Sequence, residues 1–155
     1  MRLWHYKLLS VLPRAQLLSQ WRECVAIAKG LKETGRTNHI LINKIMDYPL
    51  DEFRNYCGLV YEEMTKRGYA VSKSVLEKMF DYISFDFRTE PKHDEVFNKW
   101  HTQNYLRQCY YNLEEKWDCG GIPDKEWNKI LEFMLLNSEI VQNAIKLGIV
   151  EFIQS

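Results

Sequence analysis

The sequence predicts an all-α protein, and three observations support this fold class. Apolar residues recur every three or four positions in six segments, which is the spacing of amphipathic helices. The 7 glycines and 4 prolines are too few for a disordered, collagen-like or low-complexity chain. The 155 residues are 46% hydrophobic and 27% charged, a globular composition long enough to bury a core. We expect a single compact helical domain of about five to six helices.

The first helix is expected to run from about Pro13 to Lys29 or Leu31. Proline suits a first helical position because its missing N–H would have no partner there, and Ser10 lies just upstream as a possible cap. The pattern ends at Gly35, and its buried stripe contains Leu17, Trp21, Cys24 and Ala28. The stretch RTNHILINKI follows, and its apolar centre is expected to form either a short strand or buried coil.

The second helix is expected from about Leu50 to Arg67, with Pro49 before it and Gly68 as a left-handed terminator. The third is expected to begin near residues 72–74. Ser74-x-x-Glu77 has the pattern of a capping box, in which the two side chains satisfy free backbone N–H groups at a helix start.

Residues 84–100 are expected to be irregular, with Pro91 as a breaker. A fourth helix should run from about Thr102 to Trp117, a fifth should open at Pro123, and a sixth should close near Gly148. The chain has no internal repeat and no long linker. We therefore expect residues 1–155 to form one domain, with a core of residues 1–119 and a helical extension, a C-terminal pair, over 120–155.

Charge is unevenly distributed although the formal net charge is zero. Residues 1–36 carry seven basic and two acidic groups, so the remainder of the chain is acidic on balance. On the first helix, Arg14, Arg22 and Lys29 are spaced to form a cationic stripe suited to phosphates. Sequence-independent DNA binding is usually accompanied by a more basic total charge.

Several function classes lack their motifs. The sequence contains no GxGxxG, GxxxxGK[ST], HExxH or GxSxG pattern. The four cysteines form no CxxC pair and the four histidines lie on separate segments, so we expect no metal site and no cofactor. No apolar run approaches the ~18 residues of a membrane span and the first residues do not resemble a signal peptide, so a cytoplasmic protein without membrane contact is expected.

Two features near the chain start bear on function, and the first of them has two interpretations. Glu23 lies at the edge between the cationic stripe and the core, either as a solvated surface carboxylate or as a half-buried acid suited to proton transfer. The segment WHYK, from Trp4 and His5 to Lys7, interleaves aromatic and basic side chains as a base-stacking surface does, but it is short.

The opening MRLWHYKLLSVLPRAQLLSQWREC resembles the start of the pyrimidine-dimer DNA glycosylase family, which includes phage enzymes of the endonuclease V type. It is most similar to a small bacterial and phage branch whose members begin MRLWH. The family's aromatic-Arg-Glu triplet is matched by Trp21, Arg22 and Glu23. Residues 47–53 and 61–69 are also similar, and residues 101–116 more weakly.

The resemblance implies a repair glycosylase and abasic-site lyase that acts on DNA containing a pyrimidine dimer, without a cofactor. In the family, the α-amine of the chain attacks C1′ of the damaged nucleotide and forms a Schiff base, from which the strand is cleaved. An α-amine suits this step because its ordinary pKa is about 7.7–8.0. Since Arg2 is too large for normal removal of the initiator residue, the amine is expected to be that of Met1.

The resemblance assigns Glu23 to proton handling and to stabilising the sugar cation. Arg22 matches a family arginine that contacts the DNA, and Arg2 matches an arginine near the start of the family's chains, whereas a further family arginine falls at Ala26. Together with the stripe residues, the chain-start aromatics and the loop histidine, these give the expected DNA contacts: Arg2, Arg22, Arg14, Lys29, Trp4, His5 and His39.

Two other functions stay open at this point. One is a non-catalytic module on the same fold that binds nucleic acid or a nucleotide ligand through Arg2, Arg14, Arg22 and Lys29. The other is a protein-interaction role in which aromatic side chains of residues 120–155 contact a protein partner.

Overall fold

The computed structural model describes residues 1–148, except for the side chains of residues 140 and 141. Throughout this part the regular structure is helical, with no strand, which confirms the all-α prediction. In chain order the elements are the short 3₁₀ helix η1 (Tyr6–Val11), α1 (Arg14–Thr34), the 3₁₀ helix η2 (Ile42–Asp47), α2 (Leu50–Lys66), α3 (Lys73–Ile83), α4 (Gln103–Asp118), α5 (Asp124–Leu136) and α6 (Glu139–Lys146).

Prolines and glycines set the helix boundaries largely as predicted. Pro13 and Pro49 are the residues directly before α1 and α2. Gly35 and Gly68 follow these helices with φ angles of +72° and +75°, a backbone conformation that residues with a Cβ rarely adopt. No side chain caps α1, so the suggested role of Ser10 is wrong.

The start of α3 differs from the predicted capping box. Ser72, not Ser74, is the cap, and its side-chain oxygen accepts a hydrogen bond from the N–H of Val75 at 3.2 Å. Ser74 already lies inside the helix, where its hydroxyl faces that of Ser72 at 3.1 Å. Two serines separated by one residue offer two possible cap positions, and the sequence pattern selected the wrong one.

The stretch after α1 contains neither of the two expected forms. Its apolar residues Ile42 and Ile45 are buried on η2, a 3₁₀ helix, instead of on a strand or in coil. The sequence also gave no indication of η1, which buries Leu8 and Leu9. Both 3₁₀ helices are six residues long, too short for a 3.6-residue period to be recognised.

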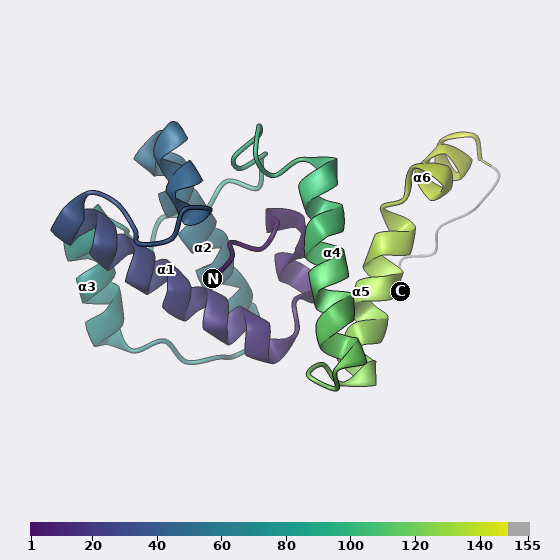
Figure 1. Ribbon diagram of the computed structural model, residues 1–155, viewed down its shortest axis with the longest axis horizontal. Helices are drawn as coiled ribbons and strands as arrows, with labels where there is room; N and C mark the ends of the chain where they lie inside the picture. The colour runs from purple at the N-terminus through teal and green to yellow at the C-terminus, as the bar shows by residue number, and fades with distance from the viewer. Residues whose placement is uncertain (149–155) are drawn as a thin grey trace. The chain divides into compact units, whose positions relative to one another are not determined.

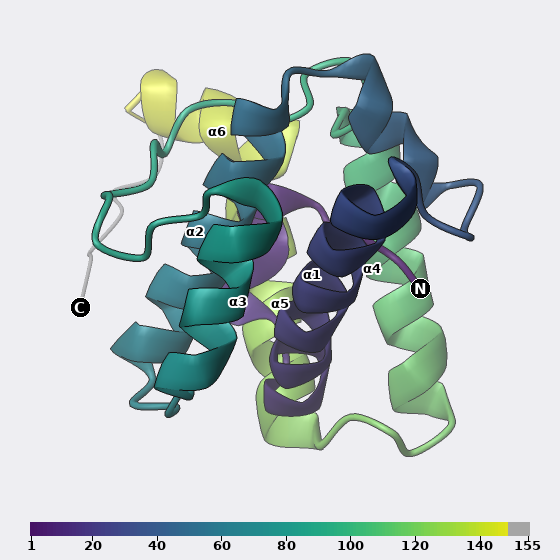
Figure 2. The ribbon, with the colours of Figure 1, turned by 90° about the vertical axis from the view of Figure 1, so that its left-hand side faces the viewer.

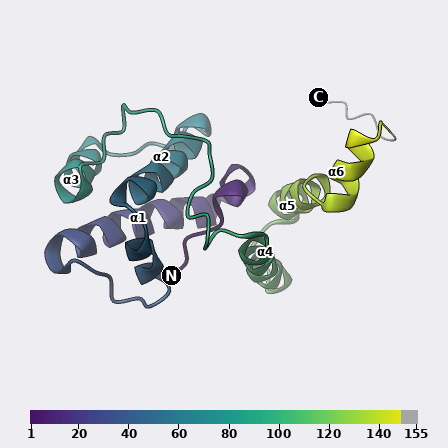
Figure 3. The ribbon, with the colours of Figure 1, turned by 90° about the horizontal axis from the view of Figure 1, so that it is seen from above.

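The contacts group the chain into two compact units, Met1–Cys109 and a second that begins at Tyr110. In the first unit α1 packs against both α2 and α3, which lie on the same side of it (Figures 1, 2 and 3). The single domain with a core of residues 1–119 stays a prediction, and residues 149–155 of the predicted extension lie outside the described part of the chain.

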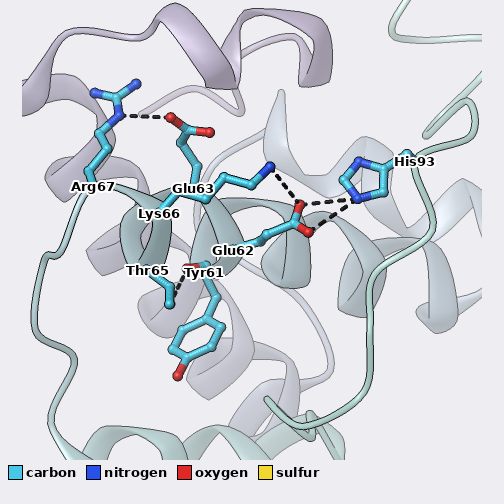
Figure 4. Close-up of polar contacts among 7 residues, drawn as sticks. All are labelled: Tyr61, Glu62, Glu63, Thr65, Lys66, Arg67 and His93. Carbon is cyan, nitrogen blue, oxygen red and sulfur yellow. Dashed lines mark hydrogen bonds and ion pairs between the residues drawn. The ribbon is translucent and has the colours of Figure 1, made fainter.

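Arg67, directly after α2, attaches the chain start to this helix. Its guanidinium is oriented by Glu63 through an ion pair of 2.8 Å, which Figure 4 shows beside the more exposed cluster of Glu62, Lys66 and His93. The same guanidinium donates to the carbonyls of Leu12 at 2.7 Å and Leu9 at 3.2 Å. The guanidinium thus binds carbonyls at and directly after the end of η1, of which that of Leu9 also accepts the N–H of Leu12 at 3.4 Å, so the segment before α1 is held in place.

The second unit contains most of α4 together with α5 and α6. Trp127 on α5 stacks on Trp117 with ring centroids 5.2 Å apart, and Tyr110 stacks on Trp127 at 5.5 Å. Helices α5 and α6 contact each other, in agreement with the predicted C-terminal pair. Among the residues that the structure describes, no helix combines the length and the apolar character needed to cross a bilayer.

Candidate active site at the chain start

Glu23 lies on α1 directly beside the first peptide bond of the chain. It is half-buried, and its Oε2 accepts hydrogen bonds of 3.3 Å from the backbone N–H of Arg2 and from the side-chain amide of Gln20. The α-amine of Met1 is separated from the Arg2 nitrogen by only two backbone atoms, so it lies within about 7 Å of this carboxylate. A separation of this size leaves room for a water molecule or a substrate atom between the amine and the carboxylate.

Gln20 and Tyr56 hold the next residues of the chain start. Gln20 is buried, and its Oε1 accepts the N–H of Trp4 at 2.8 Å. The Tyr56 hydroxyl on α2 donates to the carbonyl of Trp4 at 2.6 Å and lies 3.1 Å from the same Gln20 oxygen. Because buried polar groups are costly to leave unpaired, this arrangement fixes the N–H and the carbonyl of Trp4, which belong to two consecutive peptide units, against α1 and α2.

Two residues from the other end of the first unit, His101 and Tyr105, also hold the chain start. Together with Gln20 and Tyr56 they form a set of polar contacts that we call the clamp. Tyr105 donates its hydroxyl proton to the carbonyl of Leu3 at 2.6 Å, and His101 Nδ1 accepts the N–H of Tyr6 at 3.1 Å. His5 Nε2 lies 2.9 Å from the carbonyl of His101, to which it donates, while its Nδ1 accepts the N–H of Lys7. These partners assign the neutral Nε2–H tautomer to both histidines.

Burial keeps both histidines neutral and makes the clamp sensitive to acid. Desolvation is the main cause that lowers the pKa of His5 to about 4 and that of His101 to about 2. In the unfolded chain a histidine has a pKa near 6.5, so below this pH the unfolded state binds protons that the folded state does not. The contribution of these two histidines to the free energy of unfolding is therefore fully present above pH 6.5, and it falls as the pH decreases toward 4.

We expect the free energy of unfolding to decrease by up to about 1.4 kcal/mol per pH unit for each of these histidines between pH 6.5 and 4.5. Urea unfolding at several pH values measures this slope. The substitution His101→Gln should make the slope shallower, whereas His93→Gln, at an exposed histidine, should leave it as in the wild type. An equal slope in the wild type and in His101→Gln would contradict this origin of the acid sensitivity.

Met1 lines a cavity of about 400 Å³ between the second half of α1 and the loop that follows it. Ala26, Ile27 and Gly30 form the helix side, and Thr37, Asn38 and His39 form part of the loop side. This volume is within the range of small-molecule sites. Ala26, the position of a further family arginine, thus contributes a small side chain to the wall.

Met1 is the link between the cavity and the carboxylate: it lines the cavity, while Glu23, which does not line it, precedes Ala26 by three positions on α1. Larger cavities exist in the first unit. One of about 500 Å³ between α2 and the segment before α4 is lined by six carboxylates and only two cations, which disfavours a nucleic-acid phosphate. The part of the chain that the structure describes contains no cluster of three side chains that would hold a metal ion.

The four cations predicted to bind DNA have different surroundings. Arg14, Arg22 and Lys29 are all exposed along α1. Lys29 pairs with Glu33 at 3.7 Å, and the Arg14 guanidinium lies 5.4 Å from the centre of the Tyr69 ring. Arg22 has neither an ion pair nor a hydrogen bond among the described side chains, so its charge is available to a ligand.

Arg2 is oriented differently from the stripe. Its guanidinium lies over the rings of Trp4 at 5.8 Å and Tyr105 at 5.9 Å, and the residue is half-buried. The guanidinium therefore packs against the clamp, one residue from the amine. A role of Arg2 at the DNA stays a prediction.

Trp4 and His5 do not form the open stacking surface expected from WHYK. Both are buried, with 7% and 2% of their surface exposed, because their backbone and ring atoms are used by the clamp. This corrects the interpretation of the segment as a base-stacking surface. His39, the third non-cationic candidate, is half-buried in the cavity wall, and its Nδ1 is buried without a hydrogen-bond partner among the described atoms.

Sequence reasoning did not identify Gln20, Tyr56, His101 and Tyr105 as parts of the site. One signal was present for Gln20, because this polar residue lies between Leu17 and Cys24 on the buried face of α1. A polar side chain inside an apolar stripe indicates a buried hydrogen bond. The other three come from segments up to 102 residues away, and no local pattern connects them with the chain start.

The geometry defines a helical protein that fixes its own chain start against a half-buried carboxylate, next to a cavity. Residues 1–77 match the family model of the pyrimidine dimer DNA glycosylases. This N-terminal half of the chain therefore belongs to the pyrimidine dimer DNA glycosylase family, as the resemblance indicated, which supports a DNA glycosylase-type enzyme with DNA as substrate.

The match includes Met1, Glu23, Gln20 and Tyr56, but it ends before His101 and Tyr105. The weaker similarity over residues 101–116 thus lies outside it. No curated protein and no solved structure gives a significant match.

Proposed function

We propose that the protein is a repair glycosylase and abasic-site lyase for DNA that contains a pyrimidine dimer, with the α-amine of Met1 as nucleophile and Glu23 as the residue that handles protons. The observation that carries this proposal is the hydrogen bond from the Arg2 N–H to Glu23 Oε2, which keeps the amine beside the carboxylate. Membership of residues 1–77 in the glycosylase family supports the same reaction class.

The clamp supplies what an amine nucleophile at a chain end needs. A free chain start is normally mobile, and ordering it during the reaction would add an entropic cost to the barrier. Here the carbonyl and the N–H of Trp4 are bound by buried side chains, and the carbonyl of Leu3 by the half-buried Tyr105, before substrate arrives. The site is in this sense preorganised, and only Met1 itself, with 52% of its surface exposed, stays accessible.

The proposed reaction proceeds in two stages. The neutral amine forms a bond to C1′ of the damaged nucleotide as the C1′–base bond breaks, with the bonding electrons and then a proton going to the departing base. Glu23 stabilises the positive charge that develops on the sugar and, when protonated, gives a proton to the ring oxygen as the sugar opens to the Schiff base.

In the second stage a proton leaves C2′, the C3′–oxygen bond breaks and the phosphate departs with its electron pair. Water then hydrolyses the Schiff base and frees the amine. A carboxylate beside the sugar is in position to take the C2′ proton, so one residue serves in both stages.

Arg22 is the cation with the clearest expected contact to DNA, since it is exposed and lacks an intramolecular partner among the described residues. We expect Arg22→Ala to weaken binding of a duplex about threefold to tenfold at 0.1 M salt and to reduce the slope of log K against log salt by about 1. Fluorescence anisotropy titrations at several salt concentrations measure both quantities. Lys78→Ala, which removes an exposed charge on α3, is the matched control, and an Arg22→Ala slope equal to that of the control would refute a phosphate contact.

Nicking of supercoiled plasmid tests the proposed function directly. Ultraviolet-irradiated plasmid should be converted to the open circular form, and unirradiated plasmid should not. Absence of nicking on irradiated plasmid and on an abasic-site duplex would reject the enzyme.

A non-catalytic nucleic-acid- or nucleotide-binding module is the second candidate, favoured by the zero net charge and by Ala26 at a family arginine position. It predicts binding without nicking. A protein partner at residues 120–155 predicts instead that deleting this segment abolishes partner binding and leaves DNA affinity intact.

A further inference from the structure

Another of the larger cavities of the first unit has basic and aromatic walls. Its volume is about 470 Å³, and it is lined by Lys44, Asp47, Tyr48, Asn98, Lys99 and Trp100. Both lysines are exposed, and neither ammonium group has an ion pair among the residues that the structure describes. With two cations and one carboxylate, this cavity has a positive balance, in contrast to the acidic cavity beside α2.

The walls of this cavity offer several hydrogen-bond donors to one anion. Burial raises the pKa of Tyr48, so its hydroxyl keeps its proton, and the backbone of Lys99 is a hydrogen-bond partner of this hydroxyl. The side-chain amide of Asn98 and the two ammonium groups are further donors. A negatively charged group with several acceptor oxygens, such as the phosphate of a nucleic-acid backbone, matches this set.

The turn over residues 98–100, which forms one wall, is held by its own hydrogen bonds. Phe97, directly before it, is fully buried and has a φ of +53°, a left-handed conformation that is uncommon for a bulky residue. Its carbonyl accepts the N–H groups of Trp100 at 2.8 Å and of His101 at 2.7 Å, and its own N–H donates to Glu52 Oε1 at 3.2 Å. The turn therefore fixes the cavity wall together with His101, a residue of the clamp.

A row of aromatic rings and cations connects this cavity with the chain start. Lys44 Nζ lies 5.9 Å from the centre of the Trp100 ring, which lies 5.7 Å from the centre of the Tyr105 ring. The Arg2 guanidinium lies 5.9 Å from the centre of the same tyrosine ring. The charges of Lys44 and Arg2 are therefore at most about 18 Å apart, the length of about five phosphates at ~3.4 Å of helix axis each.

We propose that this cavity binds one phosphate of the DNA, within about five nucleotides of the sugar that reacts at Met1, with Lys44 and Lys99 as its cations. This inference rests on the proposed function. Each neutralised phosphate releases counterions and adds affinity. A chain whose net charge is zero depends for this on sites that are locally basic, and the cavity is such a site within reach of the chain start.

A scan of single neutral linkages tests this assignment. The duplex contains a tetrahydrofuran abasic analogue, which cannot form a Schiff base, and one methylphosphonate at a time replaces a phosphate near the analogue. With the wild type, we expect one position within about five nucleotides to weaken binding about threefold to tenfold in anisotropy titrations. With Lys44→Gln/Lys99→Gln, the same linkage should cause no further loss, and the slope of log K against log salt on the unmodified duplex should be lower by about 1.

Lys73→Gln/Lys78→Gln, at two exposed lysines of α3, is the matched control and should keep the wild-type positional loss. A positional loss that persists in Lys44→Gln/Lys99→Gln, or a scan without any such position, would overturn the phosphate site. A second measurement titrates inorganic phosphate while the NMR signals of the Lys99 and Trp100 amides are followed. Shifts with inorganic phosphate but no positional loss on DNA would assign the cavity to a free anion and would also overturn the proposal.

The scan is independent of cleavage, since the analogue is not cut. If the protein binds DNA but cleaves no abasic-site duplex, the proposed function fails while the scan still decides on the phosphate site. If cleavage is found and the scan shows no dependence on the two lysines, only the phosphate site fails.

Discussion

Replacing Glu23 with glutamine is expected to reduce cleavage of an abasic-site duplex by at least about 100-fold and to leave DNA affinity within about threefold of the wild type. Glutamine keeps the size of the side chain and an oxygen that can accept the N–H of Arg2, so the clamp should persist. It removes the charge that we propose to stabilise the sugar cation and the group that we propose to transfer protons. Single-turnover cleavage of an end-labelled duplex, together with anisotropy titrations, measures the two effects.

Glu77→Gln is the matched control for this prediction. Glu77 is an exposed carboxylate on α3, so the same charge change occurs away from the chain start. Its cleavage rate should equal that of the wild type. A Glu23→Gln variant as active as Glu77→Gln would remove Glu23 from the mechanism, and equal losses in both variants would point to net charge alone.

The second large effect is expected from moving the amine. In a preparation whose first residue is Met1, verified by mass spectrometry, one glycine added before Met1 displaces the amine by about 3.8 Å. We expect cleavage to fall by about 100-fold or more, since misplacement by even ~1 Å can cost this much in a positioned reaction. DNA binding should change little because no cation is lost.

One glycine added after Ser155 is the control for chain extension itself, and it should leave the cleavage rate unchanged. The thermal midpoint of both extended proteins shows whether the fold is retained. Full activity with the extra glycine at the start would mean that a different amine, such as a lysine side chain, is the nucleophile.

The helices were predictable because each carries its own signals. The buried stripe Leu17, Trp21, Cys24 and Ala28 predicted α1, and Gly35 and Gly68 marked the ends of α1 and α2. The 3₁₀ helices were not predictable in this way, since six residues do not establish a period. The choice between Ser72 and Ser74 depends on backbone angles that both residues can adopt.

The candidate site was only partly predictable. The family resemblance and the position of Glu23 on α1 indicated the carboxylate, and the structure adds that it lies beside the first peptide bond. The polar network that holds the chain start depends on contacts across the fold, such as that of Tyr105 with Leu3. Burial of Trp4 and His5 reverses the interpretation of WHYK, because the sequence shows which side chains are aromatic but not which way they face.

The central claim is that the chain-terminal amine forms the covalent intermediate, and borohydride trapping on an abasic-site oligonucleotide tests it most directly. The abasic site needs no lesion specificity, and borohydride reduces the Schiff base to a stable amine link. We expect a covalent complex whose cross-link maps by peptide mass spectrometry to the α-nitrogen of Met1, and a much weaker complex with an extra glycine before Met1. A folded, DNA-binding protein that gives no complex, or a cross-link on a lysine side chain, would contradict it.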